Sequence, residues 1–241
     1  NSTLGSSNFD GNIQSTVKVN ATAGFSIVTY TGQQNASDTI GHGLGVKPQV
    51  VITKSRNSTY TYTQWYVYHH KLSTNHFLFL NETNAQADGV GDYYIDASFS
   101  STVFAVGDDI YGPNVSSNNY IAYCFSEVAG YSKFGNYIPN QNDNGPFVYT
   151  GFRPRWILLK SRGNIYGGGS PFSGNWYILD TERSTFNVAA STLASANSNA
   201  EDNAWGTEGI MDILSNGFKI RTDSLGINAT LSGSFIYLAF A

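Results

Sequence analysis

The sequence predicts an all-β protein of the sandwich or jelly-roll kind, built from two duplicated halves. Aromatic residues make up 15% of its 241 residues and 25 residues are glycine, a balance that favours strands and tight turns over helices. Short apolar runs alternate with polar stretches along the whole chain. One run occurs twice, as Pro-Gln-Val-Val-Ile-Thr-Lys-Ser-Arg at 48–56 and Pro-Arg-Trp-Ile-Leu-Leu-Lys-Ser-Arg at 154–162. A strand that recurs in this way indicates a duplication.

The chain divides into three parts on this interpretation. Residues 1–23 are small and polar, and we expect them to be a linker or arm that leads out of an upstream region. Residues 24–135 are the first β repeat and residues 136–241 are the second. The strands expected in the first repeat are the apolar runs at 24–32, 48–54, 65–68, 77–80, 102–106 and 120–128.

The second repeat follows the order of the first. We match 147–151 with 28–32, 154–162 with 48–56, 176–179 with 65–68, 217–220 with 103–106, and 235–240 with 120–125. The offset grows from 106 residues at the shared proline to 115 at the last phenylalanine, so insertions fall in loops. Strand cores keep their register because a slip of one residue would invert the buried face.

The arrangement of the halves is left open by the sequence. They could form two sandwiches side by side, or interleave into one with a pseudo-two-fold relation. Helical signal is weak. Only residues 188–200, which are rich in alanine and serine, are expected to hold one or two helical turns.

Composition excludes several classes of function. The net charge is −4, only 12% of residues are charged, and no basic block is present, which excludes nucleic acid as a partner. No apolar run reaches 18 residues, so no membrane insertion is expected. Cys124 is the single cysteine, which excludes a disulfide within the chain, and its apolar neighbours predict a buried side chain.

Residues that could carry chemistry are scattered. His69 and His70 would point to opposite faces of one strand and could not bind one metal ion together. Asp109 and Asp223 follow matching strands and are interpreted as turn formers, although a glycoside hydrolase would need two facing carboxylates. No glycine elbow marks a nucleophilic serine. We therefore expect no catalytic residue, no metal, no cofactor and no enzymatic activity.

The repeated Lys-Ser-Arg ends are interpreted as scaffold. Lys54 and Lys160 end matching strands, where each would be a solvated cap or a partner of Asp109 and Asp223 rather than an anion site.

Tyrosine and tryptophan side chains are the best candidates for binding a receptor. Trp65 and Trp176 occupy matching positions in both halves, which favours packing over recognition. Contact residues are better sought in loops that the halves do not share, because exposed Tyr and Trp supply large, rigid contact area. The candidates of this kind are Tyr60, Tyr62, Tyr111, Tyr166 and Trp205.

Several longer motifs resemble a known family. They are Gly-Phe-Ser-Ile-Val-Thr-Tyr-Thr-Gly at 24–32, Gly-His-Gly-Leu-Gly-Val at 41–46, Trp-Tyr-Val-Tyr-His at 65–69, and the runs 120–135, 145–154 and 213–219. The chain from about residue 20 onward resembles a domain of unknown function found in tail-fibre and tail-tip proteins of tailed bacteriophages, marine and cyanobacterial ones among them. That family has no catalytic motif to carry over.

The resemblance implies a structural protein of the virion. We expect a tail-fibre or adhesin-type domain involved in host attachment, located in the tail of the virion and assembled in the host cytoplasm. Its expected partners are itself, as a homotrimer, other phage tail proteins, and a glycan or protein of the host surface. The alternatives are a purely structural tail-tip, appendage or decoration subunit, and a polysaccharide depolymerase.

Overall fold

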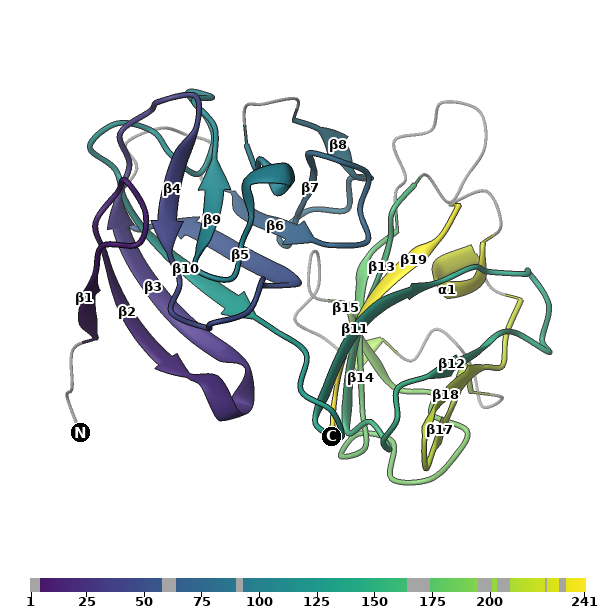
Figure 1. The fold of residues 1–241 in the computed structure, drawn as a ribbon. Coiled ribbons are helices and arrows are strands. Elements are labelled where there is room, and N and C mark those ends of the chain that lie inside the picture. The colour runs from purple at the N-terminus through teal and green to yellow at the C-terminus, as the bar shows by residue number, and fades with distance from the viewer. Residues whose placement is uncertain are drawn as a thin grey trace. The chain divides into compact units, whose positions relative to one another are not determined.

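The protein is almost entirely β structure, arranged in antiparallel sheets (Figure 1). The computed structural model describes residues 5–57, 64–89, 93–163, 174–194, 201–202, 209–223, 225–229 and 233–241. The chain divides into two compact units, of which unit 1 comprises Asn1–Phe79 and Ala87–Glu127, and unit 2 comprises Leu80–Gln86 and Val128–Ala241. Each unit places two sheets around its own apolar core, so the expected all-β, sandwich-like class is confirmed.

Unit 1 has one long sheet and one short sheet. The long sheet has the strand order β1-β2-β3-β10-β5-β6-β7-β8, and the short one pairs β4 with β9. The bounds are β1 (Ser6–Asn8), β2 (Ser15–Asn20), β3 (Phe25–Thr31), β4 (Asp38–Gly41), β5 (Val50–Ser55), β6 (Trp65–His69), β7 (His76–Phe79), β8 (Ala87–Asp88), β9 (Val103–Val106) and β10 (Asn119–Phe125), with 3-10 turns η1 (Ala21–Ala23) and η2 (Asp96–Ser98).

Alternation along the strands creates the core of unit 1. In β3, Ser26, Val28 and Tyr30 are buried, and the residues between them are half-buried. Tyr30 faces Tyr120 of β10, with ring centroids 5.2 Å apart, and its ring also meets Phe104 of β9 at 6.0 Å. Aromatic side chains therefore connect the long sheet to the short one, as the period of two in the sequence requires.

Unit 2 has a six-stranded and a three-stranded sheet. Their strand orders are β11-β19-β13-β14-β15-β16 and β12-β18-β17. The bounds are β11 (Ser132–Tyr137), β12 (Phe147–Tyr149), β13 (Trp156–Ser161), β14 (Trp176–Asp180), β15 (Thr192–Ala194), β16 (Glu201–Asp202), β17 (Met211–Leu214), β18 (Gly217–Ile220) and β19 (Phe235–Phe240), with the helix α1 (Leu225–Asn228).

The two units repeat one strand order. The series β3-β10-β5-β6-β7-β8 of unit 1 corresponds to β11-β19-β13-β14-β15-β16 of unit 2, and β4-β9 corresponds to β12-β18. The match of 147–151 with 28–32 is therefore wrong, because β12 pairs with β18 while β11 takes the place of β3 beside the closing strand. A shared Tyr-Thr-Gly ending caused the mismatch. The duplication itself, and the pseudo-two-fold relation, stay predictions.

The N-terminal part differs from the linker that we expected. From residue 6 it forms β1 and β2, and β2 pairs with β3 along six residues. Ile13 and Val17 are 2% and 8% exposed and belong to the core of unit 1, which gives this polar segment its fixed position. The division between the units falls after Glu127 rather than after residue 135, because β11 pairs with β19.

The alanine-rich run at 188–200 is not helical where the structure describes it. Thr192–Ala194 is β15, which pairs with β14, and Ala189 forms an isolated bridge with Met211. Pairing with a neighbouring strand overrides the weak helical preference of this composition.

Lys160 is buried in the scaffold of unit 2. Its Nζ donates hydrogen bonds to the backbone oxygens of Thr83, at 2.8 Å, and of Gly174, and it lies 5.9 Å from the ring centre of Trp176. Burial lowers the pKa of Lys160 to about 7. Both expected roles are wrong for Lys160, because its side chain is fully buried and cannot be a solvated cap, and because backbone carbonyls rather than Asp223 hold its ammonium group.

Lys54 is the matching residue of unit 1 and is half-buried. Its Nζ lies 5.8 Å from the ring centre of Trp65, and burial lowers its pKa. A lysine above a tryptophan is thus common to both units. Asp109 acts as the expected turn former, because its Oδ1 accepts a hydrogen bond from the Tyr111 N–H at 2.6 Å.

The buried lysine predicts a rise in stability with pH. The unfolded side chain keeps its proton up to about pH 10, whereas the folded one releases it near pH 7, so the unfolded state binds more protons between these values. The free energy of unfolding should rise from pH 7 to pH 9, by up to about 1.4 kcal/mol per pH unit. Urea titrations of the wild type and Lys160→Met measure this, and equal slopes in the two proteins would contradict it.

Candidate functional site

A shallow hollow of about 520 Å³ opens on unit 2 where two neighbouring strands meet a turn. Its lining consists of Arg155, Trp156 and residues 180–183. Trp156 is the first residue of β13 and Asp180 is the last residue of β14, and the two stand directly opposite each other in the sheet. Strand pairing therefore fixes one wall of the hollow, and the turn that follows β14 forms the other.

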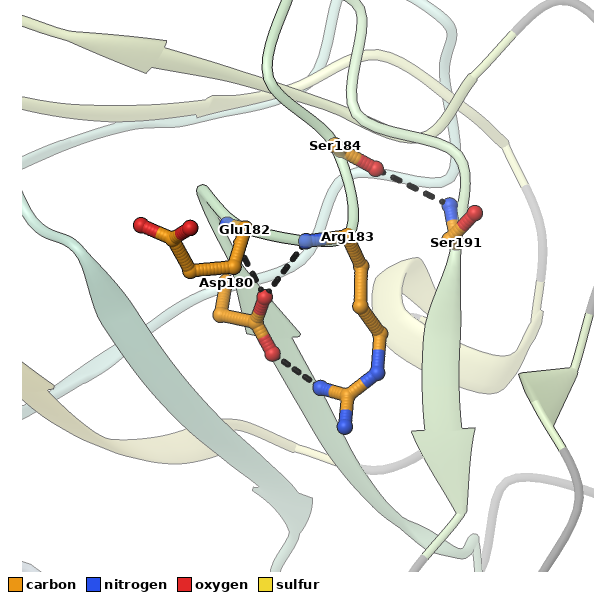
Figure 2. A network of polar contacts seen from close by, with 5 residues as sticks. All are labelled: Asp180, Glu182, Arg183, Ser184 and Ser191. Carbon is orange, nitrogen blue, oxygen red and sulfur yellow. Dashed lines mark hydrogen bonds and ion pairs between the residues drawn. The ribbon is translucent and has the colours of Figure 1, made fainter.

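Asp180 organises that turn (Figure 2). Its Oδ1 accepts hydrogen bonds from the backbone N–H groups of Glu182, at 3.1 Å, and Arg183, at 2.8 Å. Its Oδ2 forms an ion pair with the Arg183 guanidinium group. An aspartate that accepts from the backbone two and three residues on is a local turn former. The same contacts hold the Arg183 side chain, which is 33% exposed, in one orientation.

Further hydrogen bonds tie the turn to its surroundings. The Thr181 N–H donates to the Arg155 carbonyl at 3.0 Å, which joins the turn to the start of β13. The Ser184 Oγ accepts from the Ser191 N–H at 3.2 Å, as Figure 2 shows. The hollow is thus bounded by backbone that is held at several points.

Trp156 lines the hollow and packs against Phe240 of the neighbouring strand β19. The side chain is half-buried, and its ring lies 5.7 Å from that of Phe240 at an angle of 55°. The neighbouring Arg155 is exposed, and its N–H donates to the Phe240 carbonyl at 2.7 Å. The tryptophan therefore has a fixed position but keeps part of its surface available.

Unit 1 has the same framework at the matching place. The His70 N–H donates to the Gln49 carbonyl at 2.8 Å, as Thr181 does to Arg155 in unit 2. The Lys71 N–H donates to Nδ1 of His69 at 3.1 Å, so His69 takes the role that Asp180 has in unit 2. The turn after the second strand of the motif is therefore built in the same way in both units.

The side chains on that shared framework differ. Val50 stands opposite His69 and Phe125 as Trp156 stands opposite Asp180 and Phe240, but Val50 is fully buried. The arginine before Trp156 corresponds to Gln49 in unit 1. The tryptophan and the two arginines of the hollow are therefore particular to unit 2, because the matching positions of unit 1 hold Gln49, Val50 and a turn with His69, His70 and Lys71.

The arrangement can bind a polar ring but lacks a free pair of carboxylates. A lining that contains an indole and two arginines can stack on the apolar side of a sugar and donate to its hydroxyl or carboxylate oxygens. Glycoside hydrolysis needs one carboxyl group as acid and a second as base or nucleophile. Both oxygens of Asp180 are already engaged by the turn, which leaves Glu182 as the exposed carboxylate of this lining.

The receptor candidates chosen from the sequence fall mostly outside the described residues. Tyr60, Tyr62, Tyr166 and Trp205 lie there. Tyr111 is described, is 45% exposed, and lies in unit 1 between β9 and β10. Its carbonyl accepts a hydrogen bond from the Tyr66 hydroxyl, which anchors the loop.

Trp156 was missed because it begins an apolar run that reads as a buried strand. The signal that could have found it was the contrast with Val50 at the matching position of the other half.

Other polar groups have structural roles. Buried His42 accepts a hydrogen bond at Nδ1 from the Leu44 N–H, and burial lowers its pKa. Burial raises the pKa of the Cys124 thiol to about 12. In the described ranges, no three His, Cys, Asp or Glu side chains gather as metal ligands would. None of the helices in those ranges has the length and apolar character to cross a membrane.

The role of Asp180 can be tested by two substitutions. Asp180→Ala should lower the free energy of unfolding by about 1–2 kcal/mol, because two backbone N–H groups lose their acceptor. Asp180→Asn keeps that acceptor and loses only a partly exposed ion pair, so a loss of about 0.5 kcal/mol is expected. Urea denaturation distinguishes the two. If both variants lost the same amount, the hydrogen bonds to the turn would not be the stabilising contribution.

Comparison with known proteins identifies the family. A family model described as "Domain of unknown function (DUF7483)" matches residues 1–241, and the chain belongs to this family. The expected membership of a family of unknown function is thus confirmed, and its association with phage tails stays a prediction. Neither a curated protein nor a solved structure matches the chain.

Proposed function

We propose that the chain is a tail-fibre or adhesin-type protein of a phage virion, and that the hollow of unit 2 binds a glycan of the host surface. One observation carries the proposal. Arg155 and Trp156 at the start of β13 line one hollow together with Arg183 on the turn that Asp180 fixes, whereas the matching positions of unit 1 hold neither a tryptophan nor an arginine. A difference of this kind between matching positions favours recognition over packing.

Rigidity supports the proposal. Strand pairing and turn hydrogen bonds already hold the lining residues, so little conformational freedom remains to be lost when a ligand binds. A shallow, open site on such a framework suits a sugar at the surface of a cell, which offers a ring face for the indole and hydroxyl groups for the arginines.

The proposal extends to assembly. As a fibre protein, the chain would form a homotrimer, contact other tail proteins, and be assembled in the host cytoplasm. The buried Cys124 suits that reducing compartment, since the fold depends on packing and hydrogen bonds rather than on a disulfide within the chain.

The test transplants the residues of unit 1 onto unit 2. Arg155→Gln and Trp156→Val together reproduce the side chains Gln49 and Val50 on the matching framework, so the fold should be kept. Binding of the labelled protein to host cells should fall by about 30-fold or more, the usual loss when a central aromatic contact is removed. Phe9→Ala, at a residue 72% exposed in unit 1, is the control and should bind as the wild type does.

Other outcomes separate the alternatives. Unchanged binding by the double variant would move recognition away from the hollow, and a loss on changing Tyr60, Tyr62 and Trp205 to Ala would place it in those loops. Absence of any cell binding would favour a purely structural virion subunit. New reducing ends after incubation with host polysaccharide would show a depolymerase.

A further inference from the structure

Strand β12 of unit 2 leaves one edge of its sheet open. The Ile220 N–H donates to Pro146 O, and the Thr150 N–H donates to Asn216 O, both at 3.0 Å. The backbone groups of Pro146 and Thr150, on either side of β12, therefore point toward β18 and its flanks. By the alternation of an antiparallel pair, the backbone groups of Phe147 and Tyr149 point the opposite way. In the described part of the chain, these two N–H and two C=O groups have no hydrogen-bond partner.

The matching edge of unit 1 is covered by the chain itself. Phe104 of β9 and Phe218 of β18 are matching residues of the two partner strands. When β4 and β12 are aligned on these partners, Thr39 and Gly41 occupy the places of Phe147 and Tyr149. There the Ile13 N–H donates to Thr39 O at 3.1 Å, and the Thr39 N–H donates to Oδ1 of Asn12 at 2.6 Å.

Ser15 completes this cover, since its Oγ donates to Gly41 O at 2.9 Å. The segment 12–15 thus covers an edge whose counterpart in unit 2 has no such cover among the residues that the structure describes. This position in the fold therefore accepts a further extended segment, which in unit 1 is a single bridge at Ile13 flanked by side-chain hydrogen bonds.

The open edge also lacks the usual protection against association. Residues 145–152 read Gly-Pro-Phe-Val-Tyr-Thr-Gly-Phe and contain no charge. Phe147 is 46% exposed and Tyr149 is 64% exposed, so the strand presents two aromatic side chains to solvent. Sheet edges that stay solitary commonly carry lysine or an inward-pointing charge. Here only the shortness of the strand and Pro146 limit pairing.

We propose that β12 docks against β12 of a second copy of this chain. An antiparallel pair centred on Val148 places Phe147 of one copy opposite Tyr149 of the other, twice by symmetry. Every outward N–H and C=O group of both strands then gains a partner. Two cross-strand aromatic pairs form beside them, and the two three-stranded sheets become one continuous sheet.

A second copy fits this edge better than a segment like 12–15. That segment is already engaged in unit 1 of every copy, whereas β12 is complementary to itself and meets no like charge when paired. The contact is short, so association is expected in the micromolar range or weaker. The inference does not depend on the hollow and goes beyond the proposed function.

Sedimentation equilibrium over a series of concentrations tests the pairing. The wild type should gain mass with concentration, and a variant with Phe147→Lys and Tyr149→Lys should associate at least about tenfold more weakly, because lysines then face each other. A control with Phe9→Lys should associate as the wild type does. Mixing the lysine variant with one carrying Phe147→Glu and Tyr149→Glu should restore association, since opposite charges then meet.

Three results would overturn the proposal. One is a wild type that stays monomeric up to millimolar concentration. Another is an oligomer, trimeric or otherwise, that persists unchanged in the lysine variant although circular dichroism shows both proteins folded. The third is a monomeric wild type that binds a peptide of residues 9–16 at this edge, which would make a separate extended segment the occupant.

Discussion

Insertion of the closing strand between two earlier strands of each unit is the constraint on which the rest of the structure depends. β10 lies between β3 and β5, and β19 lies between β11 and β13, so the last strand of each unit returns to pair with two earlier strands. Phe125 then stands opposite Val50, and Phe240 opposite Trp156. A slip of one residue would turn Val51 and Cys124, both fully buried, away from the core of unit 1 to the other face of the sheet, so the core favours a single register.

That register fixes the shared parts of the two units and leaves their surfaces free to differ. Both units place a lysine above a tryptophan at the end of the Lys-Ser-Arg strand. Both build the turn after the next strand on a side chain that accepts from the backbone, His69 in one and Asp180 in the other. The hollow of unit 2 and its open edge at β12 are departures from this common plan. Departures from a framework that both units share are where a function specific to one unit can reside.

Sequence patterns predicted the strands well because alternation is local. The pairs 48–56 with 154–162 and 65–68 with 176–179 occupy corresponding places in the two sheets. Features that depend on distant partners were missed. Residues 147–151 were assigned to the wrong counterpart, and residues 12–15 gave no sign of covering β4, because Asn12 and Ser15 replace backbone groups by side chains. Trp156 was predicted to be part of a buried strand, because an apolar run does not reveal that its first residue lies beside the turn that follows a neighbouring strand.

The central claim is that recognition resides in the part of unit 2 that unit 1 does not share. Hydrogen–deuterium exchange of the protein, with and without surface polysaccharide from a cell that it binds, tests this most directly. The account predicts slower exchange at residues 155–156 and 180–184 with ligand, and unchanged exchange at residues 49–50 and 69–72. Equal protection of both turns, or protection of neither, would contradict it.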